Sequence, residues 1–148
     1  MHALDGAAAL IIGSRAWGEK KGKKPIAKIL AAASAGVEPR IMGVGPAYAI
    51  PLALQRAGLK LKDMDIIEIN EAFASQVLGC LKLMDVDFKD PRVNPNGGAI
   101  AIGHPLGASG ARISTTLLHN MIDRNANLGL ATMCIGVGQG IATIFERV

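Results

Sequence analysis

Three side chains that can move a proton or hold a water molecule lie where predicted elements end. Asn70 follows a segment at 63–69 that alternates and then becomes apolar, as a strand does, and Cys134 ends a second predicted strand at 128–134. His104 lies just before a predicted helix. Because ligands of open α/β sheets gather at the carboxyl ends of strands, we expect the amide, the imidazole and the thiol to converge on one crevice.

His104 lies within a glycine-rich stretch at 96–110, NGGAIAIGHPLGASG, with Gly103 and Pro105 on either side. A helix N-terminus carries partial positive charge, which disfavours the imidazolium form, so this histidine is expected to be neutral and to act as a base or a hydrogen-bond donor. The surrounding glycines remove side-chain bulk and let another backbone or a substrate approach closely. A buried histidine bonded to a carbonyl is the alternative that residue type alone leaves open.

Cys134 precedes a glycine-rich turn at 136–140. Backbone N–H groups of such a turn can form an anion hole beside the sulfur, although a buried, inert cysteine is an equally weighted alternative. The Asn70 amide can hold a water molecule, but a lone asparagine at this position is more often a helix cap. The second cysteine, Cys80, lies among apolar residues of a predicted helix and is interpreted as packing.

The composition favours an aliphatic core. Half of the 148 residues are hydrophobic, 18 are glycine and only 3% are aromatic. The charged fraction is 19%, below the usual value of about 25%, so either the domain is compact or some of its surface is covered by another chain or domain. The net charge is +4, and the lysine-rich run at 20–24 is interpreted as a solvated loop rather than a nucleic-acid patch.

The two cysteines form neither a disulfide framework nor a metal-binding spacing, so we expect no metal and a reducing compartment, the cytoplasm by default. No apolar run is long enough to span a bilayer. The beginning of the sequence lacks the basic and apolar regions of a signal peptide. We therefore expect neither a membrane nor a nucleic acid as partner.

Alternating strands and helices predict an α/β layered fold, in which a final hairpin makes the sheet mixed. Gly45-Pro46 begins one of the clearer helices, and Gly58 ends it. The segment 26–36 is left open, because its alanines favour a helix whereas its flanking proline and glycine favour a buried strand. Strands are expected at 7–12, where the segment should be buried, and at 63–69, 128–134 and 140–146, and helices at 14–21, 45–57, 72–84 and from about 106 or 107 to 122.

Taken together, these motifs resemble the thiolase family, the acyl-CoA acyltransferases that make or cleave 3-ketoacyl-CoA. The sequence NEAF at 70–73 looks like a family box, the stretch from Asn96 to Arg112 is similar to the signature GGAIAxGHPxGASGxR, and 134–140 looks like a CxGxGxG signature. Segments at 5–9 and 43–46 follow in family order. The resemblance covers essentially the whole chain and implies the C-terminal half of the thiolase fold, a mixed β-sheet covered by helices.

The resemblance also implies catalytic roles. His104 would activate a nucleophilic cysteine and share an oxyanion hole for the thioester carbonyl, and Asn70 would hold the water molecule that completes this hole. Cys134 would be the acid/base at the α-carbon of the substrate. The N–H of Gly136 would contribute to a second oxyanion hole.

Substrate binding is implied for two further residues. Phe73 would line the acyl pocket, and Gly103 belongs to the glycine-rich backbone against which a pantetheine thioester would lie. The partner is then an acyl-CoA or CoA, and no further cofactor is expected because the CoA thioester is the substrate. The mitochondrion and the peroxisome suit this family as well as the cytoplasm does.

Two departures from the family pattern matter. Val137 interrupts the family's glycine triplet, a position that could take a different backbone conformation. The family chain is also longer, with its nucleophilic cysteine in an N-terminal half and most CoA contacts in a loop domain. We therefore expect residues 1–24 to be the tail of that half and residues 25–148 to be the C-terminal thiolase domain.

A chain without the nucleophile is expected to have no turnover alone. It would work with the missing half or as a homo-oligomer, and the alternative is a non-catalytic, thiolase-like binding or assembly subunit. The apolar face that an isolated half exposes is expected to cause self-association.

Overall fold

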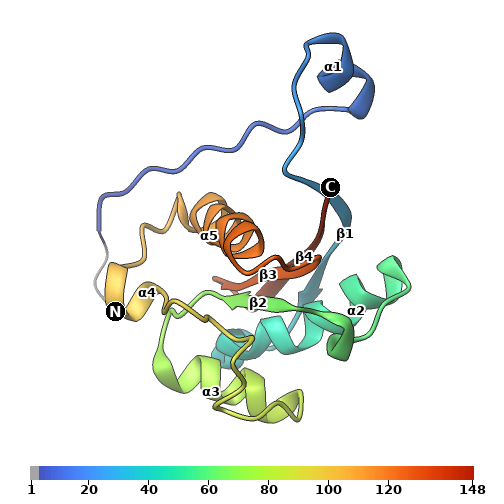
Figure 1. The fold of residues 1–148 in the computed structure, drawn as a ribbon. Coiled ribbons are helices and arrows are strands. Elements are labelled where there is room, and N and C mark those ends of the chain that lie inside the picture. Colours follow the sequence, from blue (N-terminus) through green and yellow to red (C-terminus); the bar gives the residue numbers. More distant parts are fainter. Residues whose placement is uncertain (1–3) are drawn as a thin grey trace.

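The sheet has four strands in the order β1-β4-β3-β2, within a computed structural model that describes residues 4–148 (Figure 1). Strand β2 is parallel to β3, whereas β3–β4 and β1–β4 are antiparallel. The predicted α/β fold with a mixed sheet is therefore confirmed. The strands are β1 (Ala27–Gly36), β2 (Ile66–Ile69), β3 (Leu128–Ile135) and β4 (Gln139–Arg147).

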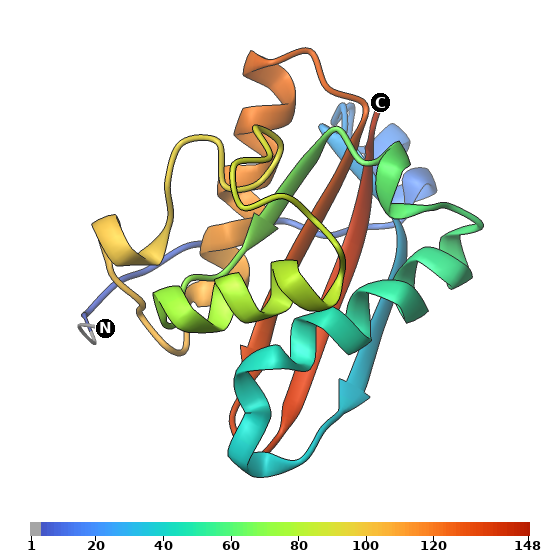
Figure 2. The same cartoon turned by 90° about the horizontal axis from the view of Figure 1, so that it is seen from below.

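Helices cover both faces of the sheet. Helices α2 and α3 lie on one face and α5 on the other, as Figures 1 and 2 both show. The two faces carry separate cores, one centred on Ile50, Ile67 and Leu130 and the other on Leu117 and Met121. The helical elements are α1 (Arg15–Lys20), η1 (Pro39–Val44), α2 (Gly45–Ala57), η2 (Leu61–Asp63), α3 (Ala74–Leu83), α4 (Ala99–Ile102) and α5 (Ser109–Asp123).

Within residues 4–148, no helix combines the length and the apolar character needed to cross a bilayer. The core side chains are almost all aliphatic, as the composition predicts, and Phe145 is the largest exception.

The segment that the sequence left open forms strand β1, which pairs with β4 along its whole length. Backbone pairing with a neighbouring strand therefore outweighs the helical preference of its alanines. The expectation of a buried strand at 7–12 is wrong, because this segment is extended but carries no ladder, and Ile11 and Ile12 are 90% and 76% exposed. A strand needs a partner backbone, and the described part of the chain provides none for it.

Capping residues and glycines in the sequence predicted the ends of α1 and α2 well. Ser14 caps α1 by accepting a hydrogen bond from the backbone N–H of Trp17 at 3.2 Å, and Gly58 ends α2 in the left-handed region with φ 70°. Helix α5 begins at Ser109, later than predicted, because 105–108 forms a turn in which the Ala108 N–H donates to the Pro105 carbonyl. Helix α2 continues through Pro51.

The start of α2 lies directly on the start of β4. Gly45 and Gly140 meet backbone to backbone, and a Cβ atom at Gly140 would come within 2.7 Å of the Pro46 nitrogen. Side chains at either position would force the helix away from the sheet. The two glycines therefore set the distance between α2 and the hairpin that carries the glycine-rich turn.

We predict that Gly140→Ala lowers the free energy of unfolding by about 1–3 kcal/mol, the usual cost of overpacking. The matched control is Gly36→Ala, since a Cβ atom there meets nothing within 4 Å, and a change within about 0.5 kcal/mol is expected. Urea denaturation followed by circular dichroism measures both. Equal effects of the two substitutions would contradict the close packing.

Candidate active site

Asn70 and His104 meet at the carboxyl end of β2. The backbone N–H of Asn70 donates to the Thr132 carbonyl at 2.9 Å, which extends the parallel ladder by one residue beyond Ile69. The Asn70 side chain is fully buried, and its Nδ2 lies 3.2 Å from Nε2 of His104. The structure therefore brings together two of the three side chains that the sequence singled out.

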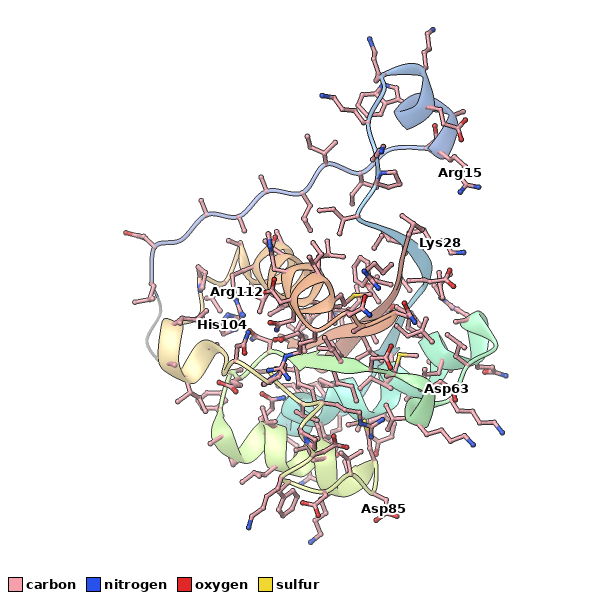
Figure 3. The ribbon with its side chains drawn as sticks, in the orientation of Figure 1. Arg15, Lys28, Asp63, Asp85, His104 and Arg112 are labelled. Atoms are coloured by element: carbon pink, nitrogen blue, oxygen red, sulfur yellow. The ribbon has the colours of Figure 1, made fainter. Side chains whose placement is uncertain are left out.

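A third residue, Arg112, determines which way the Asn70 amide faces. Its NH2 lies 3.0 Å from Oδ1 of Asn70, and a guanidinium can only donate. Oδ1 therefore faces Arg112, and the amide NH₂ group faces His104. Consequently Nε2 of His104 accepts a hydrogen bond and carries a lone pair. Figure 3 shows His104 and Arg112 close together beside the sheet.

The other ring nitrogen of His104 agrees with this assignment. Nδ1 is hydrogen-bonded to Oγ of Ser109, whose own hydroxyl donates to the Pro105 carbonyl at 2.9 Å. The Ser109 hydroxyl has one proton, so it accepts from an Nδ1–H group. The imidazole is thus neutral, with its proton on Nδ1 and its lone pair on Nε2, where it accepts from the Asn70 amide.

Burial lowers the pKa of His104, and the positive charge of Arg112 lowers it further. The expected neutral state therefore agrees with the structure, and burial and the charge of Arg112 are causes that the sequence did not reveal. Helix α5 begins at Ser109, five residues beyond His104, and the side chain of this first helical residue is bonded to Nδ1 of the ring.

Cys134 lies on β3 at the same edge of the sheet. It is two residues beyond Thr132, whose carbonyl holds Asn70, and its side chain is buried. Burial raises the pKa of the Cys134 thiol, so the protonated form dominates at neutral pH. Among the described residues, no hydrogen bond joins this thiol to Asn70 or His104.

The turn after Cys134 is a tight hairpin loop. Gly136 is exposed at its start, and Val137 adopts φ 67°, a left-handed conformation that is unusual for a β-branched residue. Val137 thus adopts a backbone conformation that glycine takes at lower cost. Its side chain is 82% exposed, so the conformation costs the loop no buried contacts.

The two expected substrate-binding residues flank the pair. Phe73 lies at the N-cap of α3 with its side chain half exposed. Gly103 ends α4 with φ 89°, and Leu4 packs so closely against it that a Cβ atom would overlap the leucine side chain. Both the backbone angle and this approach therefore require glycine at position 103.

A polar clamp that the sequence did not single out holds the end of β2. The Asn94 side chain accepts from the Ile69 N–H at 2.8 Å and donates to the Ile69 carbonyl at 2.9 Å, as a neighbouring strand would. It also donates to Glu71, whose second oxygen accepts from the Ile100 N–H at 3.0 Å. The clamp ties β2 to α4, the helix directly before His104.

A buried carboxyl group lies on β2 on the α5 side. Glu68 is 1% exposed and accepts a hydrogen bond from the Asn120 amide at 2.8 Å. Burial is the main cause that raises its pKa to about 7, and the hydrogen bond from Asn120 and the charge of Arg112 oppose this rise. Glu68 was also missed by the sequence analysis, because nothing in the alternation of β2 marks it as buried.

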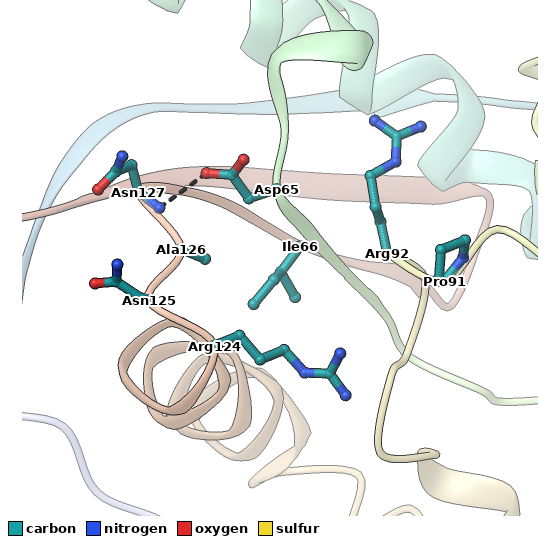
Figure 4. Close-up of a pocket in the computed structure, with 8 residues that line it drawn as sticks. All are labelled: Asp65, Ile66, Pro91, Arg92, Arg124, Asn125, Ala126 and Asn127. Atoms are coloured by element: carbon teal, nitrogen blue, oxygen red, sulfur yellow. Dashed lines mark hydrogen bonds between the residues drawn. The ribbon is translucent and has the colours of Figure 1, made fainter.

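One hollow of the surface lies away from Asn70 and His104. A pocket of about 350 Å³ is lined by Asp65, Arg92, Arg124 and their neighbours, at the ends of β2 and β3 where these strands begin (Figure 4). The Arg92 guanidinium there is already bonded to Asp90 and to the Leu61 and Met64 carbonyls. Because Asp65 and Ile66 lie at the start of β2, the pocket is at the opposite end of this strand from Asn70. Within residues 4–148, no three metal-ligating side chains gather.

Comparison with known proteins places the chain in a family context. The profile described as "Thiolase, C-terminal domain" matches residues 23–147. The chain is 58% identical over 97% of its length to a 3-oxoadipyl-CoA/3-oxo-5,6-dehydrosuberyl-CoA thiolase of Escherichia coli (strain K12). It is 59% identical over 97% of its length to a 3-ketoacyl-CoA thiolase of Yersinia enterocolitica.

Its fold is similar to that of human mitochondrial 3-ketoacyl-CoA thiolase, with a TM-score of 0.88 and 46% identity over 91% of this chain. This confirms the predicted thiolase-like layered fold. The chain spans 36% and 38% of the two bacterial relatives and 34% of the human chain, so it corresponds to about a third of each.

The raised pKa of Glu68 predicts a pH-dependent stability. The folded state holds its proton up to about pH 7, against an ordinary value of 4.5, so this contribution is complete below pH 4.5 and is lost as the pH rises through 7. Glu68→Gln mimics the protonated acid and does not titrate. It should match wild type at pH 4 and exceed it by about 3 kcal/mol above pH 8.

Urea denaturation at pH 4, 6 and 8.5 measures this difference. The matched control is Glu19→Gln, which removes an exposed carboxylate paired with Arg15. A Glu68→Gln profile parallel to wild type across this range would show that the carboxyl group is not held in its neutral form.

Proposed function

Because this chain belongs to the thiolase family through that family's C-terminal domain, we propose that it supplies part of the active site of an acyl-CoA acyltransferase that makes or cleaves 3-ketoacyl-CoA. The observation that carries the proposal is the buried His104–Asn70 pair, in which a neutral imidazole keeps its Nε2 lone pair at the carboxyl end of β2. A lone pair held in this way fits a general base that acts on a thiol.

In the proposed reaction, Nε2 of His104 takes the proton of a nucleophilic cysteine, and the thiolate attacks the substrate carbonyl. The resulting imidazolium then presents Nε2–H to the negatively charged oxygen of the tetrahedral intermediate. Once Nε2 is protonated, the Asn70 NH₂ group no longer donates to it and can instead hold a water molecule that serves as the second donor. Their buried setting strengthens both hydrogen bonds.

Whereas His104 accepts a proton from the nucleophile, Cys134 would donate one to the substrate. When the bond between the α- and β-carbons of a 3-ketoacyl-CoA breaks, its electron pair passes to the α-carbon as an enolate. A thiol with a raised pKa is a suitable proton donor to that carbon, and the thiolate left behind takes a proton in the reverse direction. The Gly136 N–H group would stabilise the enolate oxygen, and Phe73 and Gly103 would contact the acyl and pantetheine parts.

The nucleophile would come from outside these 148 residues. Cys80 is fully buried, its thiol donates to the Gly43 carbonyl at 3.4 Å, and burial raises its pKa, all of which oppose attack on a substrate. The proposal assigns residues 1–24 to the tail of the nucleophile-bearing half and 25–148 to the C-terminal domain. It requires CoA thioesters and no further cofactor, and the two free cysteines suit a reducing compartment such as the cytoplasm.

The test is a chimera in which this chain replaces the aligned part of the Yersinia enterocolitica 3-ketoacyl-CoA thiolase. We expect CoA-dependent cleavage of a 3-ketoacyl-CoA by the chimera and none by the 148-residue chain alone. His104→Ala and Cys134→Ala should each lower kcat by about 10²–10⁴-fold, because each removes a proton-transfer group. His119→Ala, at an exposed position of α5, is the matched control and should leave kcat unchanged.

A folded chimera without turnover, or one in which His104→Ala behaves like His119→Ala, would contradict the proposal. Binding of CoA thioesters by a folded, inactive chimera would instead favour a non-catalytic binding subunit. Turnover by the 148-residue chain alone would show that the nucleophile lies within it.

We also propose that the exposed apolar segment at 10–12 is covered by a second copy of the chain or by the missing half. Leu10, Ile11 and Ile12 are all exposed on an extended backbone whose N–H and C=O groups have no ladder partner in the described chain. Light scattering should show self-association of the isolated chain, and the paired substitution Ile11→Lys/Ile12→Lys should reduce it. Leu83→Lys, at an exposed position of α3, is the control. A monodisperse wild-type monomer would contradict this expectation.

A further inference from the structure

Arg112 occupies a position that is unfavourable for a cation. It lies in the first turns of α5, where the helix dipole disfavours positive charge, and burial lowers its pKa. Its Nε and NH1 atoms are buried without a hydrogen-bond partner, and its side-chain hydrogen bond goes from NH2 to Asn70. A half-buried guanidinium with two unpaired, buried nitrogen atoms lowers stability, so its contact with Asn70 calls for a functional explanation.

The hydrogen bonds around His104 have two self-consistent arrangements. In the observed one, Oδ1 of Asn70 faces Arg112, its NH₂ group faces Nε2 of His104, and Nδ1–H donates to Ser109. In the other, the amide is turned by 180°, Oδ1 accepts from an Nε2–H group, and Ser109 donates to Nδ1 instead of to the Pro105 carbonyl. The second arrangement places the Asn70 NH₂ group against the Arg112 guanidinium, donor against donor.

We propose that Arg112 is a positioning residue that fixes the Asn70 amide and thereby selects the Nδ1–H tautomer of His104. Only this tautomer leaves a base at Nε2, the nitrogen that faces Asn70. The consequence for catalysis rests on the proposed function, whereas the selection of the tautomer does not.

Charge contributes in the same direction. The guanidinium lowers the pKa of His104. The carboxyl groups of Glu68 and Glu71 raise the pKa of Arg112 and so favour its charged form. Glu71 is bonded to Asn94 and to the start of α4, and Glu68 to Asn120, so neither carboxylate compensates the Arg112 charge through a direct hydrogen bond. Arg112 thus keeps the ring neutral and also sets which nitrogen carries its proton.

The test uses ¹⁵N NMR of the imidazole nitrogens of the 148-residue chain, in which protonated and unprotonated nitrogens resonate far apart. In wild type, Nδ1 should be protonated and Nε2 unprotonated. In Arg112→Gln, whose amide can present either a donor or an acceptor to Asn70, the ratio of the Nε2–H to the Nδ1–H tautomer should rise about tenfold or more, because a hydrogen bond from a charged group is lost. The pKa of His104 should also rise.

Arg124→Gln is the matched control, since it removes the same charge at the exposed C-terminal end of the same helix and should leave the tautomer unchanged. Arg112→Lys keeps a charged donor and should restore most of the wild-type ratio. Circular dichroism and the spectrum of the remaining amides report whether each variant is folded.

Asn70→Asp gives an independent test that keeps Arg112. A carboxylate at this position accepts from both neighbours, so Nε2 of His104 should become protonated and its pKa should rise. The proposal is overturned if wild type has the Nε2–H tautomer, if Arg112→Gln and Arg124→Gln give the same ratio, or if Nε2 stays unprotonated in Asn70→Asp. Because these readouts need no substrate, they separate failure of this inference from failure of the proposed acyltransferase function.

Discussion

The parallel pairing of β2 with β3 is the constraint on which the site depends. Strand β2 contributes only four residues to the ladder, and the pairing continues to the backbone of Asn70, which is bonded to the Thr132 carbonyl. This bond places the Asn70 side chain at the edge of the sheet where β3 delivers Cys134 two residues later. On the side of β2 that faces away from β3, the Asn94 amide takes the place of a neighbouring strand by bonding both backbone groups of Ile69. A shift of β2 by one residue would point Asn70 to the other face.

The polar residues of the site form a chain inside an otherwise aliphatic interior. Ser109, His104, Asn70 and Arg112 are joined by successive hydrogen bonds, so the donor or acceptor role of each one fixes that of the next. A buried polar group without a partner raises the free energy of the folded state. Each donor in the chain of bonds is therefore matched to an acceptor, and this gives the chain one direction. The protonation of one imidazole is thus decided by a guanidinium that does not contact it through a hydrogen bond.

Much of this could be predicted from sequence, and the misses have physical causes. Helices α1 and α2 and the final hairpin follow from caps, glycines and alternation, and the choice of Asn70 and His104 followed from their places at element ends. Glu68 and the clamp of Asn94 were missed because their burial and their partners arise from segments distant in the chain. The segment at 7–12 was misjudged because a short apolar run indicates a buried strand but says nothing about whether a partner strand exists.

The sequence by itself determined the fold class, the aliphatic character of the two cores, the approximate elements and the glycines that permit close backbone approach. These depend on local conformational preference and on hydrophobic periodicity, which act over short stretches of chain. Tertiary structure alone decided that 26–36 is a strand, that burial and Arg112 disfavour the charged form of His104, and which of its nitrogens carries the proton. Those outcomes depend on desolvation and on donor–acceptor matching between residues many positions apart, and no local pattern contains that information.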